Sequence, residues 1–483
     1  MRLLTWSAIG LASTGTAYLI ANSAVLLGST DMTWSQVVGA GYFIADLLIV
    51  LGATAIAISA RTRYGRIGFP FACAIILFGS AMTSHSAGRL EYQFAAGALT
   101  LIHQLAAAAW IGGMPYLLVC LRYAETTEVA GRMTARFSRL AITSVSLVVA
   151  AGAGLSFFYV GSTSAAFGTT YGIMVVGKVL LTCAVLGMGA LNLRIVRAAR
   201  SGASPDLFPL ARFAEVEVGI GFTIILAAAA LTSAPPAIDL LSQRVTAPEI
   251  AERVKPAWPR LETPSWNELS PPTSLTRTDP TGLQSFVPGQ SYTPPLPGDI
   301  AWSEYNHHWS GLLVLAMGLL ALLATRIAWA RHWPVLFIAL AVFVLIRADP
   351  ENWPLGPRGF WASFQVAEVS QHRLFVVLII AFAAFEWAVQ TGRLAPARAG
   401  LFFPLVCAFG GALLLTHSHS VQNIKEEFLA ELSHLPLAIL AVIAGWSRWL
   451  EIRLPQHRMR AFTWVWPVCL VMIGAILLNY REG

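Results

Sequence analysis

Residues 138–161 read SRLAITSVSLVVAAGAGLSFFYVG, and after Arg139 this stretch contains no charged residue. A helix needs about 20 apolar residues to cross the hydrocarbon core of a bilayer, so this stretch is long enough to span a membrane. Similar apolar stretches predict further spans near 3–28, 35–59, 66–87, 96–121, 170–193, 213–233, 305–328, 333–348, 371–390, 399–417, 427–448 and 461–479. The sequence therefore predicts an all-α fold, a polytopic transmembrane helical bundle with about 13 spans.

The composition of the whole chain also indicates a membrane protein. Of its 483 residues, 56% are hydrophobic and only 12% are charged, whereas charged residues make up about 25% of a typical soluble domain. So few charges cannot cover the surface of a water-soluble protein of this size. Intrinsic disorder is excluded because disordered chains are poor in apolar residues. The lipid bilayer is the predicted environment.

The net charge of +7 does not indicate a nucleic-acid partner, because Lys and Arg lie in short loops between apolar stretches and not in one basic stripe. Loops 61–66, 122–136 and 194–212 are rich in Arg, whereas loops 29–34 and 162–169 contain neither Lys nor Arg. Positive charges mark cytoplasmic loops. This alternation predicts a cytoplasmic N-terminus and a C-terminus on the outer side of the membrane.

Residues 234–304 form a long hydrophilic segment that is rich in proline and has no sustained period. Such a composition is typical of a linker, and we interpret the segment as an extracytoplasmic linker in which a short helix could form near 248–254. The linker separates a predicted seven-helix N-terminal module, 1–233, from a predicted six-helix C-terminal module, 305–483.

The histidines are the most informative polar residues. Of the ten, only His332 and His457 fall on the predicted cytoplasmic side. Ionisable residues inside a membrane are costly and mark functional sites, and imidazole is a common ligand for copper, zinc and iron. Glu431 lies three residues before His434, the carboxylate–imidazole spacing found in metal sites of helical bundles. The candidate metal ligands are therefore His85, His103, His307, His308, His372, His417, His419, Glu431 and His434.

An ordinary packing role is the alternative for each of these residues, since an intramembrane histidine can simply donate a hydrogen bond to a backbone carbonyl. The five cysteines lie within apolar stretches without CxxC spacing, which predicts packing residues and neither disulfides nor a zinc site. The sequence contains no HExxH motif, phosphate-binding glycine loop or nucleophile–base arrangement. We therefore expect a protein that is not an enzyme.

Residues 103–113, HQLAAAAWIGG, resemble the signature helix of the copper-resistance D family of bacterial inner-membrane proteins. Similar positions follow over roughly 81–238, namely Phe137–Ala141, Tyr171–Gly172, Lys178, Asn192–Arg194, Glu217 and Leu231–Pro236. The resemblance implies a multi-pass inner-membrane protein linked to copper resistance or copper uptake, often beside periplasmic copper-binding proteins. Among the family-pattern positions His103, Trp110, Lys178 and Glu217, only His103 is an obvious ligand type.

These observations predict a copper-handling inner-membrane protein that takes up a copper ion from the periplasm or transfers it to the cytoplasm, with a periplasmic copper-binding protein as a partner. Two alternatives stay open. Paired intramembrane histidines could instead ligate haem b, as in a b-type membrane cytochrome. The chain could also be a non-catalytic assembly or sensing scaffold whose 234–304 segment docks a periplasmic protein.

Overall fold

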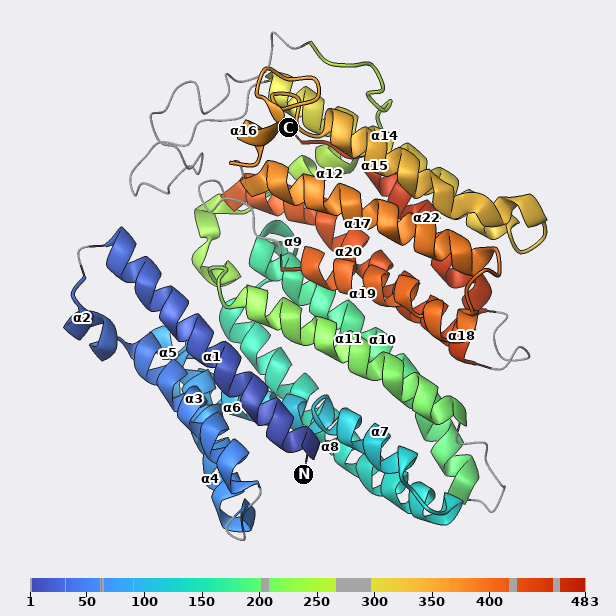
Figure 1. The fold of residues 1–483 in the computed structure, drawn as a ribbon. Helices are drawn as coiled ribbons and strands as arrows, with labels where there is room; N and C mark the ends of the chain where they lie inside the picture. Colours follow the sequence, from blue (N-terminus) through green and yellow to red (C-terminus); the bar gives the residue numbers. More distant parts are fainter. Residues whose placement is uncertain are drawn as a thin grey trace. The chain divides into compact units, whose positions relative to one another are not determined.

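The computed structural model describes residues 2–482, except 31, 61, 63–64, 90, 201–207, 266–296, 366, 417–423 and 455–460. In this part of the chain the secondary structure is helical, and the only β-type pairing is an isolated bridge between Asn352 and Arg358. The predicted all-α fold is confirmed, and the long helices run in bundles (Figure 1).

Among the described residues, ten helices are long and apolar enough to cross a membrane. Three shorter apolar helices, Gly68–Met82, Phe402–Leu414 and Phe462–Leu478, coincide with the remaining predicted spans. The predicted membrane bundle is therefore confirmed, whereas the number of helices that cross the bilayer stays a prediction.

The chain forms two compact units, which are described separately. The first comprises Met1–Thr163 and Thr232–Asp239, and the second comprises Ser164–Leu231 and Leu240–Gly483. The predicted modules, by contrast, divide at the 234–304 linker. The structure places the helices between residues 164 and 231 in one unit with the C-terminal half of the chain.

The first unit pairs α1 with α3, α3 with α4, and α6 with α8. Three predicted spans are interrupted: 35–59 between α2 and α3 at Ala40, 66–87 between α4 and α5, and 96–121 between α6 and α7 at Ile111 and Gly112. A Cβ on Gly113 would lie 2.9 Å from the ring of Phe137, so this glycine lets α7 approach α8. The helices are α1 (Arg2–Ser29), α2 (Trp34–Gly39), α3 (Gly41–Ser59), α4 (Gly65–Met82), α5 (His85–Gly88), α6 (Gln93–Trp110), α7 (Gly113–Arg122), α8 (Thr127–Tyr159) and η1 (Ala237–Asp239).

The second unit is a larger bundle. Helix α14 begins at Pro297, before the predicted start at 305, so the end of the predicted linker is helical. The short helix expected near 248–254 is present as α12. The helices are α9 (Thr163–Gly168), α10 (Thr170–Arg200), α11 (Phe208–Leu231), η2 (Leu241–Gln243), α12 (Ala247–Val254), α14 (Pro297–Leu323), η4 (Ala328–Val335), α15 (Leu336–Arg347), α16 (Phe360–Ser363), α17 (Ala367–Gln390), α18 (Pro396–Ala399), α19 (Phe402–Leu414), α20 (Ile424–Arg453) and α22 (Phe462–Leu478).

Helix α22 packs against α14 on one side and α20 on another (Figure 1). Small residues make the first contact possible: a Cβ on Gly474 would lie 2.4 Å from the backbone nitrogen of Leu315, and one on Gly318 would lie 2.6 Å from that of Val471. Membrane helices associate closely where small residues let their backbones approach. This contact places the end of α22 beside the first turns of α14.

Candidate functional site

Helices α14, α17 and α20 all begin at one end of the second unit, where α11, α15 and α22 end (Figure 1). We call this end the histidine end. His307 and His308 lie in the first half of α14, His372 near the start of α17, and His434 in the first half of α20. The structure thus brings these four predicted residues to one end of one bundle. His417 and His419 lie outside the described residues.

His307 is oriented through its Nδ1 atom, which lies 2.8 Å from the backbone oxygen of Ser303. A carbonyl can only accept, so Nδ1 carries the proton and Nε2 keeps its lone pair. Metal-ligating histidines are usually held in this way by an outer hydrogen bond. The imidazole stacks on the ring of Tyr480, with centroids 3.8 Å apart and planes 20° apart.

His308, the next residue, is buried, and both of its ring nitrogens are hydrogen-bonded. The backbone N–H of Arg260 donates to Nδ1 over 2.7 Å. Nε2 then carries the proton and donates to the backbone oxygen of Tyr480 over 2.9 Å. In this conformation His308 has no lone pair for a metal, and it joins two other segments of the chain. The role of His308 as a ligand stays a prediction that this geometry does not favour.

Tyr480 also contacts the second predicted ligand helix. The ring of His434 on α20 lies 6.4 Å from the Tyr480 ring, and Glu431, one turn earlier on α20, is 4% exposed. Tyr480 itself is 4% exposed. A residue that the sequence analysis did not single out therefore contacts two predicted ligands, His307 and His434.

Glu482 holds the Tyr480 side chain in place. The Tyr480 hydroxyl donates to Oε2 of Glu482, and Oγ of Ser303 donates to the same oxygen over 2.6 Å. Burial and the neighbouring Glu482 carboxylate raise the pKa of Tyr480. Burial alone raises the pKa of Glu482, but hydrogen bonds from Ser303 and Tyr480 and the nearby positive charge of Arg253 oppose it, and this pKa lies below its ordinary value. Glu482 is thus an ionised acceptor at neutral pH.

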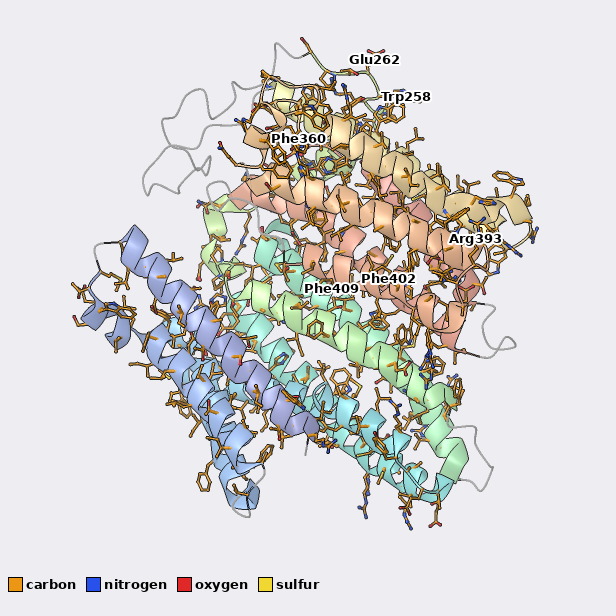
Figure 2. The ribbon with its side chains drawn as sticks, in the orientation of Figure 1. Trp258, Glu262, Phe360, Arg393, Phe402 and Phe409 are labelled. Atoms are coloured by element: carbon orange, nitrogen blue, oxygen red, sulfur yellow. The ribbon has the colours of Figure 1, made fainter. Side chains whose placement is uncertain are left out.

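The segment that follows α12, residues 255–263, is extended and crosses the histidine end; we call it the strap. The Nε1–H of Trp309 donates to the carbonyl of Leu261 over 3.1 Å, and Arg347 donates to the hydroxyl of Thr263 over 2.8 Å. Figure 2 shows Trp258 and Glu262 of the strap at this end, where Trp258 is 97% exposed. The strap and the end of α22 line an open pocket of 640 Å³, whose lining residues include Trp258, Arg260, Glu262, Glu304, His308, Asn479, Tyr480 and Arg481.

His372 lies at the histidine end with a different partner. Its Nδ1 is 2.9 Å from a carboxylate oxygen of Asp349, a residue that sequence reasoning did not link to it. The next residue, Arg373, donates to the carbonyl of Trp353 over 2.9 Å. The guanidinium of Arg373 forms cation–π contacts with aromatic rings, including that of Phe360. A carboxylate–imidazole pair is a common outer arrangement in metal sites.

The two predicted ligands of the first unit lie in separate surroundings. His103 on α6 has its Nδ1 3.0 Å from the carbonyl of Val148 on α8, and a Cβ on Gly152 would come within 3.3 Å of its ring. The glycine therefore lets α8 pass close to the imidazole. The ring of His85 lies edge-on to Tyr159, with centroids 5.9 Å apart.

Within each unit, the predicted ligands that the structure describes do not form a site of three or more groups. Among the described residues, no group of three or more His, Cys, Asp or Glu side chains could hold a metal ion. Of the other family-pattern positions, Trp110 and Glu217 are buried. The Nδ2 of Asn192 on α10 donates to a carboxylate oxygen of Glu217 on α11 over 2.6 Å, so the pair links two neighbouring helices.

A family model and a known protein each match part of the chain. The family model described as Copper resistance protein D matches residues 131–231, which form α8 to α11. The copper transport protein CutJ of Bacillus subtilis (strain 168) is 28% identical over 199 residues, which are 40% of this chain and 35% of that protein. The chain thus matches about a third of its relative's length. No solved structure matches the chain. These matches confirm the resemblance to the copper resistance protein D family over residues 131–231, and the apolar helices indicate a multi-pass membrane protein.

Proposed function

We propose that this protein takes up copper ions at the periplasmic face of the bacterial inner membrane and passes them toward the cytoplasm. The observation that carries the proposal is the family match over α8 to α11, together with a relative named as a copper transport protein. In this proposal the N-terminus is cytoplasmic, and the histidine end of the second unit faces the periplasm.

The imidazoles support this role by their orientation. His103, His307 and His372 each place Nδ1 against an oxygen acceptor. In the neutral ring the lone pair then lies on Nε2, the nitrogen that a copper ion would bind. A periplasmic copper-binding protein would deliver the ion. The chain contains no nucleotide-binding motif, so an ion gradient or handover between partners would drive transfer.

Copper accumulation in bacteria tests this function. Cells that express the wild-type protein should contain more copper than cells with an empty vector, measured by elemental analysis of the cytoplasmic fraction. The His103→Ala variant should lose most of this gain, because it removes the oriented imidazole of the family-like helix. The His332→Ala variant is the matched control, since His332 is exposed and accepts a hydrogen bond from Trp387 at the other end of the second unit.

Equal copper in expressing and empty-vector cells would overturn the proposal, and lower copper would reverse its direction. The same purified protein separates copper handling from a cytochrome. We expect no Soret absorption band; a band with one haem per chain would replace this proposal with the b-type cytochrome. Neither comparison names a haem protein.

A further inference from the structure

We infer that the loop between α15 and α17 is a lipid-binding surface, whose exposed aromatic rings insert into the headgroup region of the bilayer at the histidine end. We call residues 349–364 the aromatic loop. The inference concerns a contact with lipid and not with copper, so it does not depend on the proposed function.

The aromatic loop has a defined fold. The backbone N–H of Trp353 donates to the carbonyl of Arg358 over 2.9 Å, and the N–H of Arg358 donates to the carbonyl of Glu351 over 3.2 Å. The loop is also fixed to α17, because the carbonyl of Trp353 accepts a hydrogen bond from Arg373 over 2.9 Å. The side chains on its surface are therefore held in defined positions.

Polar groups lie inside this loop, and apolar groups lie on its surface. Asn352 and Ser363 are buried, and the charged residues are at most half-buried. Each exposed residue of 349–364 is a Trp, Phe, Leu, Pro, Ala or Gly, and Trp361 is 81% exposed. Charged residues are mostly exposed on a surface that faces water, so this loop has the opposite arrangement. An exposed apolar patch of this kind marks a contact with a membrane or a protein.

The rings form one patch around a buried guanidinium. Phe360 is its centre and lies edge-on to three rings, with centroids 5.1 Å from Trp353, 4.9 Å from Trp361 and 5.2 Å from Phe364. The Arg373 guanidinium lies 5.0 Å from the centroids of Phe360 and Phe364. Its Nε and Nη1 are buried without a hydrogen-bond partner among the described residues. The rings thus stabilise the cation, and the cation keeps the rings together.

The position of the loop identifies lipid as its partner. It joins two candidate membrane spans, Ala328–Arg347 and His372–Gln390, so it lies at one end of both. Figure 2 shows Phe360 at the histidine end. Exposed apolar side chains continue from the loop onto the first turns of α17, where Leu374 is 58% exposed and Phe375 is 54% exposed. Aromatic side chains at the ends of membrane spans lie at headgroup level.

The strap provides an exposed tryptophan for comparison in the same unit. Trp258 is 97% exposed and lines the open pocket together with Arg260 and Glu262. Its surroundings contain charges of both signs, whereas those of Trp361 are aromatic. We therefore expect water to cover Trp258 and lipid to cover Trp361.

Hydroxyl-radical labelling of the full chain in phosphatidylcholine nanodiscs tests this inference. Radicals formed in water oxidise accessible tryptophan, and mass spectrometry separates the tryptic peptides 359–373 and 254–260, which contain Trp361 and Trp258. Trp361 should be oxidised at least about fivefold more slowly than Trp258, because its ring lies among headgroups. Rates that follow the exposed fractions, 81% against 97%, would place the loop in water and overturn the inference.

A photoreactive phosphatidylcholine in the same nanodiscs identifies what covers the loop. Its diazirine lies near the headgroup end of an acyl chain. Fragment spectra should place lipid adducts on Phe360, Trp361 or Phe364, and peptide 254–260 should carry none. Slow oxidation of Trp361 without these adducts would mean that protein, such as a second copy of the chain, covers the patch, and this would also overturn the inference.

The variants Trp361→Glu and Trp258→Glu form a matched pair. A carboxylate is costly in the membrane, so Trp361→Glu should lower the yield of lipid adducts on residues 359–364 about fivefold. Trp258→Glu should leave this yield unchanged. Equal yields in both variants would show that Trp361 does not insert into the bilayer. The measurements on the wild-type chain decide the inference even if a variant fails to fold.

Discussion

The two ends of the second unit hold their charged groups in different ways. At the end where α20 finishes, Glu215 of α11 accepts hydrogen bonds from Arg212, from Arg453 and from the indole of Trp449. Glu451 likewise accepts from Arg448 and from Trp466 of α22. We call this the arginine end. At the histidine end the corresponding carboxylate, Glu482, accepts from two hydroxyls.

The two ends differ in the donors that their carboxylates receive: guanidinium and indole groups at the arginine end, and hydroxyls at Glu482. Ionised donors and acceptors form hydrogen bonds about twice as strong as neutral ones, so the arginine end joins α11, α20 and α22 firmly. At the histidine end Nε and Nη1 of Arg253 have no hydrogen-bond partner among the described residues, and at the arginine end the same holds for the Nε atoms of Arg212, Arg448 and Arg453.

The largest expected change tests the arginine end. Glu215→Gln removes the charge that Arg212 and Arg453 share, and we expect a loss of about 2–3 kcal/mol in the free energy of unfolding. Thermal denaturation in detergent measures it. The matched control is Glu128→Gln, because Glu128 and Arg132 form an exposed pair on α8, for which a change within about 0.5 kcal/mol is expected. Equal effects in the two variants would contradict the comparison.

A smaller effect should distinguish the two adjacent histidines. His308→Ala breaks two hydrogen bonds between segments, so it should lower stability by about 2 kcal/mol. His307→Ala breaks one hydrogen bond and a ring stack, so we expect a loss of about 1 kcal/mol in the free energy of unfolding. If His308→Ala abolished ion binding at unchanged stability, His308 would be a ligand and not a structural residue.

The smallest effect depends on pH. The pKa of Glu482 lies below its ordinary value of 4.5, so the ionised carboxylate stabilises the fold above about pH 4.5, and this contribution is lost as the pH falls through the depressed value. Glu482→Gln should therefore be less stable than the wild type at pH 7 by about 1 kcal/mol. The difference should shrink at pH 4. Unfolding curves of both proteins at the two pH values measure this difference in the free energy of unfolding. An equal difference at pH 7 and pH 4 would show that the charge of Glu482 does not contribute.

Much of the fold could be predicted because apolar length is a local property. Each predicted span coincides with an apolar helix, even where the chain breaks at Gly112 or where α14 begins early at Pro297. The division into units was not predictable in the same way. It depends on which helices pack together, and this is decided by close contacts such as Gly474 against Leu315, which lie far apart in the sequence.

The candidate site was only partly predictable for a related reason. The histidines could be predicted as candidate ligands from their residue type and their depth in the predicted spans, and four of them lie at the histidine end. Tyr480 and Glu482 follow the last apolar helix in a short polar segment that carries no motif. The pairing of Asp349 with His372 could not be predicted, because it depends on the position of α17 in the folded chain.

By itself the sequence determined that this protein is a helical membrane bundle with a stretch similar to the copper resistance protein D family, since hydrophobic length and a family pattern are both read along the chain. Tertiary structure alone decided which ring nitrogen of His103, His307 and His372 carries the proton and which imidazoles share a neighbour. A hydrogen bond or ring contact depends on atoms brought within a few ångströms across the bundle, and no local pattern encodes that distance.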